Sequence, residues 1–491
     1  METALNFATR LGTIGCAFLT LSLALLIHSD GAHAQTLITE VIDGCGDGIG
    51  HGLSSPFGVA IDMHGNAYVA GFVSDNAFRI TPDGTIEQII DMAGDGLGNS
   101  LINADGICVD GDGNVYVTGT ISSNAFKITP EGLVTEIIDE SGDGLGHTLR
   151  YPRRVATDDA GRVFVTGVLS GNAFKIGPTG AVNLLVGPAG DGMGNGLLAA
   201  GGIAVDSHGN VYVGGQINSI VLKITPTGDV TLVMDSSGDG NGHALGGVRK
   251  IVVDRWDNLY VTGETSNNAF RVAPDGTKTE IINSLGDVVL PITGDFNLLS
   301  APVSVATDMI GNAYVSGRVT NNVFKITPEG VIREIIDKTG DGVGNGLGFP
   351  GDVAVDSAGN VFVVGFYSSN AFRIAPDCNA NNISDLTDVS LGTSSDCNNN
   401  QIPDECDIDC DLNGTPDDCE LFSKGDFNRD GSVDANDYAG FFTCLAGPNP
   451  LSLPTPFVCR DTCRAVFDID EDNDVDLQDF ALLQTMYALS P

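Results

Sequence analysis

The sequence predicts an all-β protein, a seven-bladed β-propeller with four-stranded blades, followed by a small helical module. Three observations predict this fold class. A unit first seen as Gly58–Asp91 recurs along residues 35–376, its copies start 48 residues apart except for one step of 54, and each copy contains four strand-like runs. A four-stranded unit with this period has the size of one propeller blade. The copies begin at Gly58, Gly106, Arg154, Gly202, Lys250, Ser304 and Asp352.

The four runs of the first copy are rich in β-branched and aromatic residues, which favour strands. Between them, Met63–Asn66 has the glycine and asparagine of a hairpin turn, and Thr81–Gly84 has proline and glycine where a type I turn places them. The expected strands are Val59–Asp62, Ala67–Phe72, Ala77–Thr81 and Thr85–Ile90.

The seventh copy ends early, at Pro376, so its outer strand is missing from its place in the chain. A counterpart lies near the start, where Thr39–Asp43 (TEVID) matches Thr135–Asp139 (TEIID). We therefore expect residues 36–43 to supply the outer strand of the seventh blade. Such a strand closes the ring and removes the open edges that strand-rich proteins must protect.

Residues 1–34 have the pattern of a signal peptide. Arg10 precedes the apolar run Leu11–Ile27, and the A-x-A pattern at Ala32–Ala34 predicts cleavage before Gln35. The alternative is a membrane anchor, for which the run is short. No later stretch is apolar enough to cross a bilayer, so we expect no transmembrane span in the mature chain. The mature protein is expected to be secreted, periplasmic or at the cell surface, where disulfides can form.

The net charge of the chain excludes one class of binding partner and favours another. The formal net charge of the 491 residues is −41. We exclude nucleic acid, because a protein that binds phosphate backbones needs a basic face, whereas such acidity favours cation binding. Eight of the eleven cysteines lie between Cys378 and Cys463. A second region therefore begins near residue 377.

The stretch PFGVAIDMHGNAYVAG, residues 56–71, resembles NHL-type and related bacterial secreted propeller repeats. The resemblance covers the seven copies and implies the propeller fold. Propellers of this kind include binding platforms and a few enzymes, and similar blades occur in streptogramin lyases and gluconolactonase-like hydrolases. The fold alone does not decide between these functions, and this chain shows no acid–base or metal set that can be carried over from either enzyme.

Charged residues that recur in every copy are interpreted as blade architecture, namely turn caps and charge pairs. The links with the pattern GDGxGxxL place Asp91, Asp95 and Asn99 at spacings that suit calcium ligands, but they lack the ligand order of a calcium loop. Glycine turns explain them equally well. The recurring acids are Asp62, Asp110, Asp158, Asp206, Asp254, Asp308 and Asp356, and the recurring bases are Arg79, Lys127, Lys175, Lys223, Arg271, Lys325 and Arg373.

Positions that break the repeat are better candidates for a site. Arg154 and Lys250 stand where the first copy has Gly58, a position expected to line one mouth of the central channel. In so acidic a chain, a basic patch at this mouth predicts an anion site for a carboxylated sugar or a peptide carboxylate. The alternative is pairing of these bases with neighbouring aspartates. The complete predicted set is Arg150, Arg153, Arg154, Arg249 and Lys250.

Residues 377–423 contain the motifs DCNANNISD, DCNNNQIPDEC and DCDLNGTPDDC. Alternating Asp and Asn offer oxygen ligands to a hard cation, and cysteines can hold together segments that have little core. These motifs resemble thrombospondin type 3-like calcium repeats, and the alternative is a disordered acidic linker. Five cysteines lie here, so one of them must pair elsewhere or stay free.

Residues 424–491 contain two loops with the ligand order of EF-hand-type calcium sites. Each loop runs into an expected helix, Tyr438–Leu445 or Phe480–Tyr487. A pair of loops with exit helices resembles dockerin modules, which implies calcium as cofactor and a cohesin-like partner. Asn473 replaces the usual glycine of the second loop, and Cys444–Cys463 is the preferred disulfide between the loops. The expected ligands are Asp426, Asn428, Asp430, Ser432, Asp434, Asp437, Asp468, Asp470, Asp472, Asp474, Asp476 and Asp479.

Two hypotheses of function follow. In the first, this is an exported calcium-binding recognition protein, with the propeller as a binding platform for an anionic carbohydrate or peptide and the dockerin-like tail as its anchor. In the alternative, it is a secreted lyase or hydrolase of polysaccharide or lactone metabolism with its active site at the channel mouth. The sequence favours the first, and it identifies neither the ligand nor the docking partner.

Overall fold

The computed structural model describes residues 35–287 and 297–377 without a break. In the C-terminal region it describes residues 384–397, 403–406, 416, 419, 424–427, 432–433, 435–444, 466–469, 475 and 477–489. The predicted signal peptide, residues 1–34, lies outside the described residues.

The predicted propeller is confirmed: the described residues form seven four-stranded antiparallel sheets, one per blade. The first strand of each blade contacts the first strands of both neighbours, and β26 contacts β2 to complete the ring. The first strands are β2 (Pro56–Ile61), β6 (Ala104–Val109), β10 (Pro152–Thr157), β14 (Ala200–Val205), β18 (Val248–Val253), β22 (Pro302–Thr307) and β26 (Pro350–Val355). The second strands are β3 (Ala67–Gly71), β7 (Val115–Gly119), β11 (Val163–Gly167), β15 (Val211–Gly215), β19 (Leu259–Gly263), β23 (Ala313–Gly317) and β27 (Val361–Gly365).

The outer half of each blade follows the same order along the chain. The third strands are β4 (Asn76–Ile80), β8 (Asn124–Ile128), β12 (Asn172–Ile176), β16 (Ile220–Ile224), β20 (Asn268–Val272), β24 (Asn322–Ile326) and β28 (Asn370–Asp377). The outer strands are β5 (Ile86–Ile90), β9 (Val134–Ile138), β13 (Val182–Val186), β17 (Val230–Met234), β21 (Lys278–Ile282), β25 (Ile332–Ile336) and, for the seventh blade, β1 (Gln35–Ile42).

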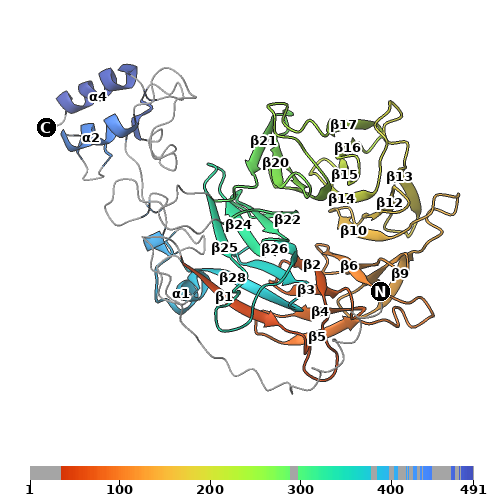
Figure 1. The fold of residues 1–491 in the computed structure, drawn as a ribbon. Coiled ribbons are helices and arrows are strands. Elements are labelled where there is room, and N and C mark those ends of the chain that lie inside the picture. The colour runs from red at the N-terminus through yellow and green to blue at the C-terminus, as the bar shows by residue number, and fades with distance from the viewer. Residues whose placement is uncertain are drawn as a thin grey trace. The chain divides into compact units, whose positions relative to one another are not determined.

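The expected ring closure is also confirmed, because β1 pairs with β28 in a sheet ordered β1-β28-β27-β26. Figure 1 shows β1 in red beside β28 in cyan, two segments from opposite ends of the propeller sequence. The first strands begin about three residues earlier than the sequence suggested. Their register shifts between Pro56 and Gly58, so a β-bulge adds residues to the pairing that period-two alternation does not reveal.

The core lies between blades. Each hydrophobic cluster joins side chains from two neighbouring sheets, as where Phe126 packs with Leu101 of its own blade and Ala70 of the preceding one. A phenylalanine of the third strand is fully buried in six blades, with Leu222 in the remaining blade. Close approach of the first strands explains the glycine at Gly58, where an added Cβ would lie 2.2 Å from the carbonyl oxygen of Asp105.

The recurring acids cap turns, as the sequence indicated. Asp62 Oδ1 accepts the backbone N–H groups of His64 and Asn66, both at 2.9 Å, and its Oδ2 accepts the Asn66 amide and the Tyr68 hydroxyl. The recurring bases divide between two roles. Arg79 pairs with Glu87 at 2.6 Å, whereas Lys127 lies over the ring of Tyr116. These charges therefore build the blade.

The links, meaning the segments from one outer strand to the next first strand, fold into turns. Asp95 Oδ1 accepts the N–H of Leu97 and its Oδ2 accepts the Asn99 amide at 2.8 Å, so this carboxylate is engaged within its own link. In three links a histidine replaces that asparagine and makes the same contact with the aspartate four residues before it. The pairs are His51 with Asp47, His147 with Asp143 and His243 with Asp239.

The C-terminal region, from Pro376, forms a separate compact unit that includes the short stretch before Ile38. Its elements are α1 (Asp385–Leu391), the 3₁₀ helix η1 (Asp404–Cys406), α2 (Ala435–Cys444) and α4 (Leu477–Leu489). The two expected exit helices are confirmed as α2 and α4, each of which begins about three residues earlier than expected. Phe441, Phe467 and Leu483 are fully buried in one core shared by α2, α4 and the segment before the second loop.

All but one of the cysteines in the described residues are disulfide-bonded. Cys397 and Cys419 form a disulfide, and Cys45, Cys406 and Cys444 are each disulfide-bonded. Cys108, in the first strand of the second blade, is the free thiol among the described residues. Cys463, the preferred partner of Cys444, lies outside the described residues. No helix within the described part of the chain is long and apolar enough to span a membrane.

Candidate binding site at the channel mouth

The links and the turns between second and third strands lie at the same end of every blade, because the four strands alternate in direction. We call this end the link face. Residues at equivalent places in the seven blades form concentric rings around the channel on this face. The inner ring is Phe57, Asp105, Arg153, Gly201, Arg249, Val303 and Gly351, and the ring above it is Phe72, Thr120, Val168, Gln216, Glu264, Arg318 and Phe366.

Four guanidinium groups converge on one phenyl ring at the mouth. The Cζ atoms of Arg153 and Arg154 lie 5.2 and 5.4 Å from the centre of the Phe57 ring, and those of Arg249 and Arg318 both lie at 6.0 Å. These arginines come from the third, fifth and sixth blades, and we call them the arginine cluster. Arginine binds well to aromatic faces. The Phe57 ring, contributed by the first blade, therefore offers all four guanidinium groups a common contact.

Two carboxylates offset part of this charge. Asp105 lies 3.2 Å from Arg153 Nε and 3.6 Å from Arg154 Nη1, and Glu264 lies 3.4 Å from Arg249 Nε and 3.3 Å from Arg318 Nη1. The predicted alternative, pairing with nearby acids, is therefore correct for these arginines, although Glu264 is not an aspartate. The pairing is incomplete, because Arg154 Nε and Nη1 and Arg249 Nη2 are buried without a hydrogen-bond partner.

A second set of charges lies at the repeat position of Arg154, which Lys250, Ser304 and Asp352 occupy in their own blades. Lys250 Nζ donates to both carboxylate oxygens of Asp352 at 2.9 Å, and the Ser304 hydroxyl also donates to Asp352. Burial acts to raise the pKa of Asp352, but the charges of Lys250 and Arg154 outweigh it and hold that pKa below its usual range. Asp352 therefore stays ionised and paired, which suits a structural carboxylate better than a general base.

The arginine cluster is under electrostatic strain. Burial, helped by the neighbouring positive charges of Arg153 and Arg154 and opposed by Glu264, lowers the pKa of Arg249 to about 9. Arg154 and Arg249 are only 4% and 5% exposed. Buried like charges at this spacing repel each other, so an anion that reached the unpartnered guanidinium nitrogens would relieve the repulsion.

The structure separates the basic residues predicted from sequence into three groups. Arg153, Arg154 and Arg249 form the cluster, and Lys250 is paired with Asp352. Arg150 lies apart on its link, largely exposed, with Glu140 3.6 Å away. Sequence reasoning missed Arg318, which could have been found by comparing the seven turns between second and third strands, where the other blades place apolar, polar or acidic residues.

Aromatic side chains border the cluster on the side of the first and seventh blades. Phe366 packs against Phe57, Phe72 and Phe349 with ring centres about 6 Å apart, and Phe349 stacks on Tyr367 at 4.4 Å. Arg318 lies over Phe349 at 4.1 Å. This aromatic wall leaves Tyr367 exposed at the link face.

An aliphatic groove of about 800 Å³ opens on the link face across the third, fourth and fifth blades. Leu169, Leu198 and Ile217 line the groove. Glu264, which pairs with Arg249 and Arg318 of the cluster, lines it as well. The groove exists because the lining positions Ala199 and Gly247 are small, where the equivalent positions of the third and seventh blades carry Tyr151 and Phe349.

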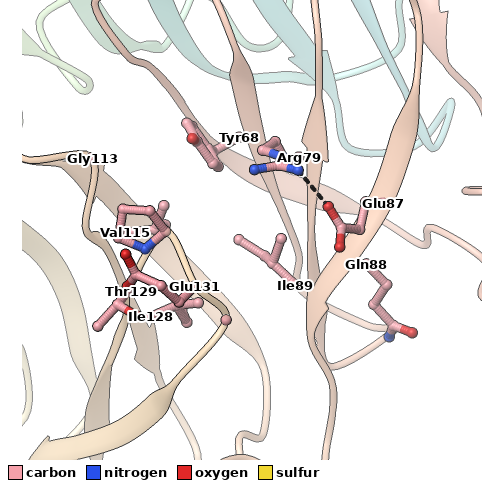
Figure 2. Close-up of a pocket in the computed structure, with 12 residues that line it drawn as sticks. Tyr68, Arg79, Glu87, Gln88, Ile89, Gly113, Val115, Ile128, Thr129 and Glu131 are labelled. Carbon is pink, nitrogen blue, oxygen red and sulfur yellow. Dashed lines mark hydrogen bonds and ion pairs between the residues drawn. The ribbon is translucent and has the colours of Figure 1, made fainter.

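A different pocket lies between the outer parts of the first and second blades (Figure 2). Arg79 points toward Glu87 on one wall, and Thr129 and Glu131 lie across from them. A pocket recurs at the equivalent positions between the fifth and sixth blades around Arg271, where Thr279 stands in place of Glu87. Because it repeats with the blades, this pocket is a consequence of blade packing.

The described parts of the two C-terminal loops share one contact pattern. The N–H of Phe427 donates to Asp437 Oδ1 and the N–H of Ile469 donates to Asp479 Oδ1, both at 2.7 Å and across ten residues. Asp426, Asp437, Asp468 and Asp479 are all buried. The remaining expected ligands apart from Ser432, which is described and exposed, lie outside the described residues: Asn428, Asp430, Asp434, Asp470, Asp472, Asp474 and Asp476.

Comparison with known proteins gives a short family match and a fold. Residues 194–220 match the beta-propeller repeat family, and no curated protein matches the chain. Virginiamycin B lyase from Staphylococcus aureus is 14% identical with a TM-score of 0.53, over 69% of this chain and 99% of that one. A catalytically inactive histidine-to-alanine variant of that lyase, with quinupristin, has a TM-score of 0.51 at 14% identity over the same shares of the two chains.

A streptogramin B lyase is equally distant in sequence, at 14% identity with a TM-score of 0.54, over 71% of this chain and 100% of that one. At such low identity these likenesses concern the fold and not the activity. The matched repeat and the similar structures agree with the seven sheets described above: the chain contains a β-propeller similar in fold to these lyases.

Proposed function

We propose that the propeller is a recognition platform that binds an anionic ligand at the arginine cluster. The observation that supports this most directly is the set of buried guanidinium nitrogens on Arg154 and Arg249 that lack hydrogen-bond partners. Five bases, the four arginines and Lys250, face the three carboxylates of Asp105, Glu264 and Asp352. The mouth therefore carries positive charge in a protein of net charge −41, and charge-assisted hydrogen bonds to an anion are strong.

The same geometry supports recognition over catalysis. In the S. aureus lyase, a histidine-to-alanine change gives an inactive enzyme. In this chain His51, His147 and His243 are held by aspartates in their links, and the carboxylates of the mouth are paired with arginine or lysine. A general base needs a free lone pair within hydrogen-bond reach of the proton that it removes; the mouth carboxylates are engaged by arginine or lysine, and each of the three histidines contacts its aspartate through Nδ1 on an exposed link.

The anion site is tested with sulfate and a short galacturonate oligosaccharide by calorimetry at constant ionic strength. Arg153→Gln removes one guanidinium while Arg154 still offsets Asp105, and we expect affinity to fall at least tenfold, since a hydrogen bond to a charged group contributes about 1.5–3 kcal/mol. Arg150→Gln is the matched control, because Arg150 is on the same blade and outside the cluster. Equal binding by both variants and the parent would contradict the proposal.

We further propose that the C-terminal unit binds calcium and serves as an anchoring module for a protein partner, which the dockerin-like pattern suggests to be cohesin-like. Four buried aspartates in two equivalent arrangements support it, since buried carboxylates need compensating charge. Residues 377–491 contain 24 acidic and only four basic residues. A hard cation held by oxygen ligands would balance part of this excess of acidic residues.

Calcium titration of the intact chain, followed by calorimetry and circular dichroism, checks this proposal. We expect added helicity and at least two sites, and the pair Asp437→Ala and Asp479→Ala should abolish both responses. Asp83→Ala, which removes an exposed turn acid of the propeller, should leave them unchanged. Absence of heat and of added helicity in the parent protein would refute the calcium proposal.

A further inference from the structure

We infer that the aliphatic groove and the arginine cluster form one site, and that its ligand is the carboxyl terminus of a peptide whose last residues are aliphatic. The inference rests on the proposed anion site and specifies its ligand class. Glu264 connects the two parts, because it lies at the edge of the groove and pairs with Arg249 and Arg318. A chain in the groove therefore reaches the cluster with its end.

The surface of the groove favours an aliphatic ligand. Leu169 and Ile217 are 68% and 73% exposed, and Leu198 is also exposed. Large apolar side chains gathered around a concave site mark a binding surface. Leu169, Leu198 and Ile217 offer no hydrogen bond to a sugar hydroxyl, so this part of the groove favours apolar side chains over a sugar. Of the two ligands that the sequence left open, the peptide carboxylate therefore fits this groove better than the carboxylated sugar.

Polar groups set between the aliphatic side chains distinguish a peptide from a plain hydrocarbon chain. Ser170, Gln216, Ser219 and Thr265 line the same groove. The amide groups of a peptide require hydrogen-bond partners when they leave water; the Ser219 and Thr265 hydroxyls can donate to them, while Ser170 already donates to Gly167 and Gln216 to Glu264. A volume of about 800 Å³ lies toward the upper end of the usual range for ligand pockets, which suits several residues of an extended chain.

The charge of the cluster, which Glu264 connects to the groove, determines the orientation of the peptide. Five bases, the four arginines of the cluster and Lys250, exceed the three carboxylates of Asp105, Glu264 and Asp352 by two charges. A terminal carboxylate can take the unpartnered nitrogens of Arg154 and Arg249, whereas an amidated end brings no charge and a free amine would be repelled. Recognition should therefore depend on the free carboxylate and on aliphatic side chains together.

The test measures fluorescence anisotropy with the full chain and a labelled peptide ending in Leu-Ala-Leu with a free carboxylate. We expect the C-terminal amide, and a version with serine in place of leucine, to bind at least tenfold more weakly. Leu169→Ser with Ile217→Ser should have the same effect. Ile121→Ser is the matched control, because Ile121 is exposed at the equivalent position of the second blade and is not part of the groove.

The outcomes separate this inference from the proposed function. If sulfate binds and Arg153→Gln weakens it, but peptide acid and amide bind equally or the groove variants match the parent, the peptide inference is wrong and the anion site stands. If neither sulfate nor peptide binds, both are wrong. If the acid, the aliphatic residues and the groove are all required, the carboxyl terminus of a peptide is the ligand class.

Discussion

At the scale of single residues, the outer strands contain glutamates that are better accommodated without charge. Asn370 donates to Glu40 at 2.8 Å and Asn322 donates to Glu334 at 2.7 Å. Burial raises the pKa of both carboxyls to about 7, with further contributions from nearby aspartates and an opposing one from the asparagine hydrogen bond. Glu136 has the same asparagine contact and a raised pKa for the same main reason.

This predicts a stability that falls as pH rises. The unfolded chain loses these protons near pH 4.5, whereas the folded chain keeps them until about 7. The stabilisation is therefore present in full below about 4.5 and is lost by about 7. At pH 8, Glu40→Gln with Glu334→Gln should raise the free energy of unfolding by about 2 kcal/mol, a value reduced for the partial exposure of both groups.

Denaturant unfolding at pH 4.5 and pH 8 measures this effect. The double variant and the parent should have equal stability at the lower pH, because both then carry neutral side chains that accept the same asparagine hydrogen bonds. Glu87→Gln is the control, since Glu87 is exposed beside Arg79 and its loss should not stabilise the protein at pH 8. A stability difference that does not change with pH would contradict the argument.

At the scale of elements, the sequence predicted what repeats and was less informative where one blade differs from the others. Seven copies predicted the four strands, the turn caps at Asp62 and its equivalents, and the matching strand at residues 36–43. These features depend on local pattern and turn chemistry, which can be read along the chain. The early starts of the first strands were missed because a bulge breaks the alternation.

The site was only partly predictable for a physical reason. Arg154 and Lys250 stand out because they replace a glycine, but their partners Asp105 and Asp352 belong to other blades, and Phe57 is contributed by a third. Contacts across a channel join residues whose separation in sequence carries no local signal. A comparison of equivalent positions in the seven blades finds the residues that differ from the repeat, including Arg318. Only the structure shows which of these residues contact one another.

At the scale of the whole molecule, the ring depends on one strand from the start of the chain. Ile42 of β1 is buried in the core between the seventh and first blades, and Ile38 packs against the core between the sixth and seventh. A propeller without β1 exposes the edge of β28 and opens both cores. Closure therefore combines the pairing of a distant strand with packing on both sides of it.

A chain that begins at residue 46 should consequently unfold at a much lower temperature than one that begins at Gln35. Loss of Ile38, Val41 and Ile42 alone removes roughly 5 kcal/mol of apolar burial, at about 1.5–3 kcal/mol for each side chain. Calorimetry gives the two melting temperatures. Because the shorter chain also lacks the disulfide-bonded Cys45, Cys45→Ser in the longer chain is needed to measure that contribution separately.

A synthetic peptide of residues 35–44 should restore much of the lost stability by pairing with β28, whereas the same peptide with Ile42 replaced by serine should not. An unchanged melting temperature for the shorter chain would show that the ring is held by its five other blade interfaces without β1.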